Sequence, residues 1–379
     1  MSNIVLNKFN KYQTTLSRLK QKCRNRTLIK PAGIDFTSND YLALSTSDRM
    51  RKAIVAAIDN GIPIGATGSR LLRGHHTVFD QLETEASTFF KSERALFFNS
   101  GYSANLAIFS ALPQRGDMIF YDEQVHASIL DGIFASKADA MAIKHNDLEE
   151  FNKKILIWRK NGGVGHPWIA VESIYSMDGD RAPLIELWHL ANQQDGFLVI
   201  DEAHATGVFG PHGRGLATFY EGQDNVILLH TCGKALGASG GLICSNQIFY
   251  EYLINRARSF IYSTAPSPLM AVAVREALKI LAEDESRLQQ LKKLYILANQ
   301  YFAGLPGAIN QGTQIIPIII GADKPTITIA NQLKQRNFDV RAIRPPSVAE
   351  NTARLRISIT LHVKENDISQ LFYVLQEIL

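Results

Sequence analysis

The chain has 379 residues, 46% of them hydrophobic and 20% charged, which is ordinary for a globular protein with one large and one smaller domain. Its 40 basic and 36 acidic residues leave a formal net charge of +4, too near balance to indicate a nucleic-acid or membrane partner. The three cysteines, Cys23, Cys232 and Cys244, form no CxxC pair, which argues against a disulfide framework, a zinc site or any other metal site built on them.

The N-terminal segment is predicted to be helical. Residues 1–30 are basic and carry Leu6, Phe9, Tyr12, Leu16 and Leu19 at roughly helical spacing. The segment has no apolar core of signal-peptide length, and no apolar run in the chain approaches the ~20 residues of a membrane helix. We therefore expect a cytoplasmic protein in which residues 1–44 form a helical segment that joins the smaller domain.

Residues 45–275 are predicted to form a large α/β domain. Short apolar runs at 95–100, 118–122, 168–175, 197–203 and 225–231 predict strands, and helical patterns follow several of them, as at 103–112, 125–136 and 182–194. Continuous runs of Val, Ile, Leu and Phe are typical of strands that are buried on both faces. Their alternation with helices predicts a mostly parallel sheet.

Residues 276–379 are predicted to form a smaller α+β domain. A long amphipathic stretch at 273–302 indicates one or two helices. Predicted strands follow at 314–321, 338–343 and 354–360, and predicted helices lie at 326–336 and 367–379. Asp367 is the expected N-cap of the last helix.

An acidic motif follows one predicted strand. The apolar run from 197 ends at Asp201, and His204 stands three residues further on. In α/β sheets, ligands bind beyond the carboxyl ends of the strands, and a buried acid there needs a cationic partner. A single acid at such a position also commonly caps the next turn, so both interpretations remain open from Asp201 alone.

The letters DEAH at 201–204 also match the metal-binding box of one helicase class. Such an ATPase needs a phosphate loop of the form GxxxxGK[ST]. The Gly-Lys pair of this chain, Gly233-Lys234, is followed by Ala235, and Leu228 stands where the first glycine is required. A DEAH-type ATPase is therefore a remote alternative.

A lysine follows another predicted strand. The run 225–231 leads to Lys234 within the small-residue turn TCGKALGASGG. An amine held among apolar and small residues suits nucleophilic chemistry, and the glycines allow close approach of the backbone to a ligand. A lone loop lysine is more often simply solvated.

Together these motifs predict a site for pyridoxal phosphate (PLP). This cofactor needs a lysine for covalent attachment and an acid that faces its pyridine nitrogen. It also needs phosphate donors, which helix N-termini commonly provide. The strand, small-residue turn and helix predicted around residues 99–105 supply such donors.

From about residue 34 to the C-terminus, ordered blocks of the chain resemble the α-oxoamine synthases, a family of fold-type I PLP-dependent enzymes. The matching blocks are FTSNDYLAL (36–44), GATGSRLLRGHHTVFDQLE (65–83), FFNSGYSAN (97–105), DEQVHASILDG (122–132), ESIYSMDGD (172–180), DEAHATGVFGPHGRG (201–215), HTCGKALGASGG (230–241), IYSTAPSP (261–268) and AIRPPSV with TARLRISIT (342–360). The resemblance implies a mostly parallel large domain, a smaller α+β domain, and a homodimer with shared active sites.

The resemblance also implies roles for individual residues. Lys234 would bind the cofactor covalently and move protons, Asp201 would pair with the pyridinium nitrogen, and His126 would stack on the ring. His204 and Ser176 would contact the phenolic oxygen. The implied phosphate contacts are Gly101, Tyr102 and Thr231, with Ser263 and Thr264 reaching the cofactor of the neighbouring subunit. Alone, His126 would be interpreted as a helix-start histidine.

The implied substrate residues lie in several blocks. Arg356 would bind the carboxylate of the amino acid, Arg344 and Ser347 would lie near the substrate, and Asn39 would lie beside the reacting centre. A strand arginine such as Arg344 is otherwise often part of a surface ion pair. Arg24 and Arg26 are both candidates for an N-terminal arginine that some relatives use.

Family membership implies the decarboxylating condensation of an amino acid with an acyl thioester. The blocks at 342–360 and the compact length favour the branch that joins L-alanine to a pimeloyl thioester, carried by CoA or by acyl carrier protein, in biotin biosynthesis. Glycine C-acetyltransferase, 5-aminolevulinate synthase and serine-condensing enzymes share nearly all the catalytic residues and remain alternatives. The chain departs from many relatives at Ala43, Ala66 and Phe79.

Overall fold

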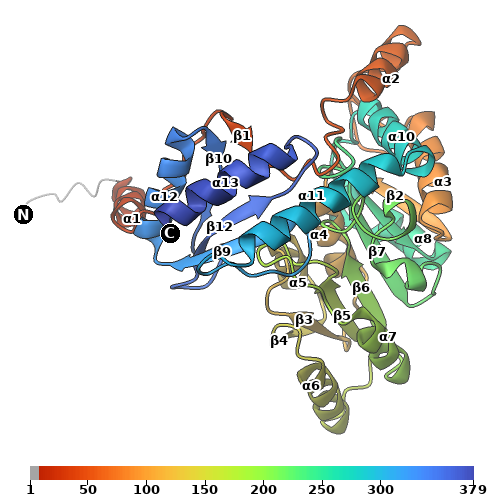
Figure 1. Cartoon of the computed structure of the whole chain (residues 1–379). Coiled ribbons are helices and arrows are strands. Elements are labelled where there is room, and N and C mark those ends of the chain that lie inside the picture. The colour runs from red at the N-terminus through yellow and green to blue at the C-terminus, as the bar shows by residue number, and fades with distance from the viewer. Residues whose placement is uncertain (1–7) are drawn as a thin grey trace, which may run out of the picture. The chain divides into compact units, whose positions relative to one another are not determined.

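The computed structural model describes residues 8–379, and its chain divides into two compact units (Figure 1). Unit 1 comprises the described part of Met1–Ser38, together with Met177–Gly179 and Lys293–Leu379. Unit 2 comprises Asn39–Ser176 and Asp180–Lys292. No helix within residues 8–379 is both long and apolar enough to cross a membrane.

Unit 2 is built on a sheet of seven strands, all of which lie within the described residues. In spatial order they are β2 (Arg94–Phe98), β8 (Gly241–Ser245), β7 (Val226–Thr231), β6 (Phe197–Asp201), β5 (Pro167–Glu172), β3 (Met118–Asp122) and β4 (Asp139–Ile143). Strand β8 is antiparallel to β2 and β7, and the other pairs are parallel. The sheet is therefore mostly parallel, as predicted.

Helices cover this sheet and complete unit 2. They are α2 (Asp48–Asp59), α3 (Thr77–Phe89), α4 (Gly101–Ala111), α5 (Ala127–Phe134), α6 (Leu148–Lys160), α7 (Leu184–Gln193), α8 (Gln247–Arg256), α9 (Arg258–Ile261), α10 (Pro268–Glu283) and the first part of α11 (Ser286–Phe302), with short 3-10 turns at Pro211–Gly213 and Ala217–Tyr220. The main core lies between the sheet and helices α4, α5, α8 and α9. Alternate residues of β5, Trp168 and Ala170, point into that core, as the two-residue period of a strand requires.

Unit 1 is a smaller α+β unit. Its antiparallel sheet has the order β11 (Arg341–Ile343), β12 (Ala353–Ser358) and β9 (Ile315–Gly321), and β1 (Ile34–Asp35) pairs with β10 (Phe338–Asp339). The helices are α1 (Asn10–Gln21), α12 (Asp323–Gln335), α13 (Glu365–Ile378) and the rest of α11. The amphipathic stretch predicted at 273–302 forms two helices, with a break at Asp284.

Two predictions at the chain ends were wrong in detail. The N-terminal helix ends at Gln21 rather than near residue 30, because the backbone at Cys23 has a positive φ of 55°. Residues 1–7 of the predicted helical segment lie outside the described residues. Asp367 is not the N-cap of the last helix, since α13 begins at Glu365. Its carboxylate instead accepts the backbone N–H of Lys364 at 2.8 Å, which satisfies a donor at the start of the helix.

Candidate active site

The turn after β7 holds Lys234 in a defined position. The N–H of Cys232 donates to the carbonyl of Gly240 at 2.9 Å, and the N–H of Ala238 donates to Cys232 at 2.9 Å. Gly237 has a φ of +60°, and a Cβ there would stand 2.4 Å from the backbone nitrogen of Ser45. Close backbone packing therefore requires glycine at position 237 of the predicted motif.

A chain of hydrogen bonds starts at this lysine. The Nζ of Lys234 lies 2.7 Å from Nε2 of His204, and Nδ1 of His204 lies 2.7 Å from the hydroxyl of Tyr41. The Tyr41 hydroxyl donates to Oδ1 of Asn39 at 3.1 Å. With the ammonium donating to Nε2 and Nδ1–H donating to Tyr41, every contact in the chain has one donor and one acceptor. The structure thus joins three predicted residues through Tyr41, which the sequence motifs did not single out.

Asp201 lies at the carboxyl end of β6 and is only 4% exposed. Its Oδ2 accepts a hydrogen bond from Nδ2 of Asn105 at 2.8 Å, and its Oδ1 accepts the N–H of Ala203 at 2.9 Å. Asn105 is buried in α4 and also donates to Oγ of Ser128 at 2.9 Å. Both carboxylate oxygens of Asp201 are therefore fixed by hydrogen bonds. Asn105, like Tyr41, is a residue that sequence reasoning missed.

A further acid, Glu172, lies beside Asp201. The two residues are paired in register on β5 and β6, and Glu172 is 2% exposed, with no partner within the described residues for its Oε1. Burial, together with the charge of Asp201, raises the pKa of Glu172 well above its ordinary value. Burial at this strand end therefore favours the protonated form of Glu172 more than water does. Sequence reasoning did not single out Glu172, although it begins the block ESIYSMDGD.

His126 is the N-cap residue of α5. Its Nδ1 accepts the backbone N–H of Ser128 at 3.2 Å and lies 2.8 Å from the Ser128 hydroxyl, which Asn105 also contacts. Burial lowers the pKa of His126, the attraction of Asp201 opposes that effect, and Lys234 lowers the pKa further. The neutral ring is suited to stacking on a cationic aromatic group. His126 also occupies the start of a helix, as its own position in the sequence predicts.

The N-terminus of α4 fits a phosphate group. Ser100 caps the helix by accepting the N–H of Ser103 at 3.1 Å, while the N–H groups of Gly101 and Tyr102 have no acceptor within the helix. A Cβ on Gly101 would stand 3.2 Å from Oγ1 of Thr231, so glycine keeps this corner open. The donors, the lysine and the strand-end acid together match the chemical groups that PLP presents.

The remaining predicted residues have the following surroundings. In unit 2, Ser263 and Thr264 are held by Asn99, whose Nδ2 donates to the Ser263 hydroxyl at 2.9 Å and to the Thr264 carbonyl at 2.8 Å. Ser176 lies in the turn that follows β5. None of these residues lies in a cluster of acids, histidines and cysteines that could hold a metal, as far as residues 8–379 show.

The predicted substrate arginines belong to unit 1. Arg356 is 7% exposed and donates to the Ser358 hydroxyl at 2.7 Å, and Arg344 donates to the carbonyl of Cys23. Ser347 accepts a hydrogen bond from Arg26 at 3.4 Å. Arg24, the other N-terminal candidate, is occupied by ion pairs with Asp323 and Glu350, both at 2.5 Å. Arg26 is therefore the better placed of the two to meet a ligand near Ser347.

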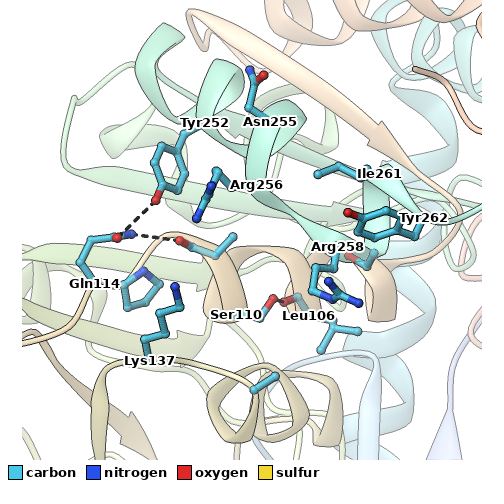
Figure 2. A pocket seen from close by; sticks show the side chains of 14 residues that line it. Leu106, Ser110, Gln114, Lys137, Tyr252, Asn255, Arg256, Arg258, Ile261 and Tyr262 are labelled. Atoms are coloured by element: carbon cyan, nitrogen blue, oxygen red, sulfur yellow. Dashed lines mark hydrogen bonds between the residues drawn. The ribbon is translucent and has the colours of Figure 1, made fainter. Parts of the chain in front are cut away.

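A separate cavity of about 560 Å³ lies in unit 2 between α4, the end of α5, and α8 with α9 (Figure 2). Figure 2 shows Lys137, Arg256 and Arg258 around it, and Gln114 hydrogen-bonded to the hydroxyl of Tyr252 at 3.2 Å. None of the predicted site residues lines this cavity. The candidate active site is therefore the cluster around Lys234.

Comparison with known proteins decides the family. A family model described as aminotransferase class I and II matches residues 31–372. The chain belongs to this family. It is 38% identical over 359 residues to the 8-amino-7-oxononanoate synthase of Chromobacterium violaceum, covering 92% of this chain and 91% of that protein.

Solved structures agree with this assignment. The structure of 8-amino-7-oxononanoate synthase from Francisella tularensis is 30% identical, with a TM-score of 0.77 and coverage of 91% of this chain and 97% of that chain. Serine palmitoyltransferase from Sphingomonas wittichii is similar in fold, with a TM-score of 0.88, 24% identity and coverage of 99% and 98%. The predicted fold-type I transferase fold is confirmed, and so, at the level of the family, is PLP as the cofactor.

Proposed function

We propose that the chain catalyses the decarboxylating condensation of L-alanine with a pimeloyl thioester. The products are 8-amino-7-oxononanoate, carbon dioxide and the free thiol, and the setting is biotin biosynthesis in the cytoplasm. The observation that carries the proposal is the Lys234 amine, which lies 2.7 Å from Nε2 of His204. The hydrogen-bonded carboxylate of Asp201 and the 38% identity to a named synthase support it.

The cofactor residues divide the work among them. When bound, PLP supplies an electron sink for the substrate carbon attached to the amino group. The carboxylate of Asp201 would pair with the pyridine nitrogen of bound PLP and stabilise the proton on it. Asn105 and the N–H of Ala203 fix both oxygens of Asp201, so the charge stays in place during turnover. Burial and the charge of Asp201 raise the pKa of the adjacent Glu172, which opposes a second negative charge beside Asp201.

Proton transfer belongs to Lys234. Its amine takes the proton from the Cα of alanine, and His204 accepts a hydrogen bond from the same amine and so orients it. A carbon–carbon bond then forms between alanine Cα and the thioester carbonyl carbon, and the carbon–sulfur bond breaks. The thiolate that leaves takes a proton from water and becomes the free thiol. The alanine carboxylate leaves as carbon dioxide, and a proton from Lys234 takes its place at Cα.

The proposal also assigns the substrate contacts and the remaining cofactor contacts. In the proposal Arg356 binds the alanine carboxylate with a guanidinium fork, and Arg344, Ser347 and Asn39 contact the reacting groups. Gly101, Tyr102 and Thr231 bind the phosphate, His204 and Ser176 contact the phenolic oxygen, and His126 stacks on the ring. In a homodimer Ser263 and Thr264 reach the phosphate of the partner subunit's cofactor.

A matrix of substrates tests the proposal. Alanine, glycine and serine are each combined with pimeloyl, acetyl, succinyl and palmitoyl thioesters, and thiol release is followed with and without PLP. We expect turnover with alanine and a pimeloyl donor, and none with Lys234→Ala. Preference for glycine with acetyl-CoA would instead identify a glycine C-acetyltransferase, and running the pimeloyl donor as both CoA and carrier-protein thioester shows which is used.

A further inference from the structure

A charged cluster in unit 2 joins two loops that carry cofactor residues. His145 follows β4, and its ring lies between two carboxylates. Nδ1 is 2.9 Å from Oδ1 of Asp122, and Nε2 is 2.7 Å from Oδ2 of Asp180. Ionised carboxylates only accept hydrogen bonds, so two of them facing the ring require a proton on each nitrogen, which makes the ring an imidazolium.

The surroundings of the ring keep it in this state. The His145 side chain is 20% exposed, Asp122 is 0% exposed and Asp180 is 13% exposed. Burial lowers the pKa of His145, but the hydrogen bonds and charges of the two acids outweigh that effect and raise it to about 10. Tyr175 packs edge-on at 4.5 Å, and Glu123 accepts the backbone N–H of His145 at 3.4 Å.

The first acid belongs to the loop that delivers His126. Asp122 is the last residue of β3, and its Oδ1 accepts the N–H of Gln124 at 2.8 Å. The N–H of Val125 donates to the carbonyl of Asp122 at 3.1 Å. Asp122 therefore sets the path of the chain up to His126, the residue that caps α5.

The second acid belongs to the turn that contains Ser176. The N–H of Tyr175 donates to the carbonyl of Asp180 at 3.0 Å, which closes the turn around Ser176. The tip, Met177–Gly179, is part of unit 1, where the carbonyl of Gly179 accepts the Thr313 hydroxyl at 2.9 Å. Two residues of unit 2 contact Asp180 at the end of this turn. His145 contacts it through Nε2, and the neighbouring Asn146 donates to it from Nδ2 at 2.7 Å.

We infer that His145 is a positioning residue that ties the His126 loop to the Ser176 turn and so places both side chains against the cofactor. The inference rests on the proposed function, because it assumes that His126 and Ser176 contact PLP. His145 itself touches neither substrate nor cofactor. Without it, two carboxylates would face one another across the gap, and the turn would be pushed from its position.

The test compares His145→Gln, Ser176→Ala and the double variant as PLP-loaded proteins. The main measurement is the pH midpoint of the visible absorbance of the bound cofactor, which reports hydrogen bonding to its phenolic oxygen. We expect His145→Gln to shift the midpoint in the same direction as Ser176→Ala, and the double variant to shift no further than the larger single. We also expect kcat/KM for alanine to fall about ten- to a hundred-fold, mainly through kcat.

Controls separate positioning from general destabilisation. His166→Gln is the matched control. His166 directly precedes β5, at the end of the strand opposite to the site, and its Nδ1 lies 2.7 Å from the carbonyl of Asp195. The variant should keep the wild-type midpoint and rate. If His145→Gln does not fold, as judged by circular dichroism, Asp180→Asn takes its place, because it removes the negative charge that attracts His145 to the Ser176 turn while keeping the pair with Asp122.

The outcomes are distinct. A wild-type protein that takes up no PLP overturns both the proposed function and the inference. A wild-type protein that binds PLP, with Ser176→Ala shifted but His145→Gln or its substitute Asp180→Asn unchanged, overturns the inference alone. An unchanged midpoint in Ser176→Ala also overturns it, since Ser176 would then not contact the cofactor.

Discussion

Side chains in unit 2 form two separate hydrogen-bond chains among the residues that are proposed to contact the cofactor and their neighbours. One runs from Lys234 through His204 and Tyr41 to Asn39, and the other links Asp201 to Asn105. The sequence predicted the members that belong to recognisable motifs. Tyr41 and Asn105 lie within matching blocks, but nothing next to them in the sequence indicates their partners, and only the folded chain brings them to residues far away in the sequence.

Removing the Tyr41 hydroxyl tests the first chain. Tyr41→Phe deletes the acceptor for Nδ1–H of His204, and this leaves a buried donor unsatisfied and frees the ring to turn. We expect kcat to fall about ten-fold with the fold retained. Steady-state kinetics and thermal melting check this, with the exposed Tyr373→Phe as control; equal loss in both variants would contradict the role of Tyr41.

The charge on His145 predicts a pH dependence of stability. Its pKa is raised to about 10 in the folded protein, above the unfolded value of about 6.5. A raised pKa favours the protonated folded state, so the stabilisation is complete below pH 6.5 and is lost as the pH rises towards 10. We expect the Tm of the wild type to fall more than that of His145→Gln between pH 7 and 10. Parallel curves for the two proteins would contradict this.

The elements follow the sequence closely where apolar runs are long. Strands β3, β6 and β7 and helix α4 lie within a few residues of their predictions. Strands β4 (Asp139–Ile143) and β8 (Gly241–Ser245) escaped prediction because neither sequence, DAMAI or GLICS, holds a long run of Val, Ile, Leu and Phe. The boundary between the units falls at Lys292/Lys293 rather than near residue 275, since α10 packs against α2 and α3 of unit 2.

The turn between β7 and β8 should tolerate no side chain at Gly237. Gly237→Ala forces a Cβ to 2.4 Å from the Ser45 nitrogen and requires alanine at a positive φ. We expect a loss of about 1–3 kcal/mol in unfolding free energy and weaker PLP binding. Denaturant melts and cofactor titration measure this, with Gly304→Ala as control because nothing lies within 4 Å of its Cβ position. Equal stability of the two variants would contradict the packing argument.

At the scale of the whole molecule, the proposed homodimer accounts for the exposure of Tyr262, which directly precedes Ser263 in the chain. The Tyr262 side chain is 73% exposed in the single chain. A second copy of the chain is the occupant that the proposed sharing of Ser263 and Thr264 requires. The sequence could predict the sharing only through family resemblance, because no residue pattern within one chain encodes its partner.

A charge at Tyr262 should weaken the dimer. Tyr262→Asp places a carboxylate next to the residues proposed to cross the interface, so we expect a larger dissociation constant and weaker PLP binding together. Sedimentation across a concentration series measures the mass of the assembly. Phe219→Asp is the control, because Phe219 is likewise exposed, at 85%. A monomeric wild type with full activity would contradict the shared site.

The attachment of the cofactor to Lys234 is the claim on which the rest depends. The purified protein is incubated with PLP, reduced with borohydride, digested and mapped by mass spectrometry. We predict a visible absorbance band that disappears on reduction and one modified peptide, the one that contains Lys234. A protein that PLP leaves colourless, or a label carried by another lysine with Lys234 unmodified, would contradict the account.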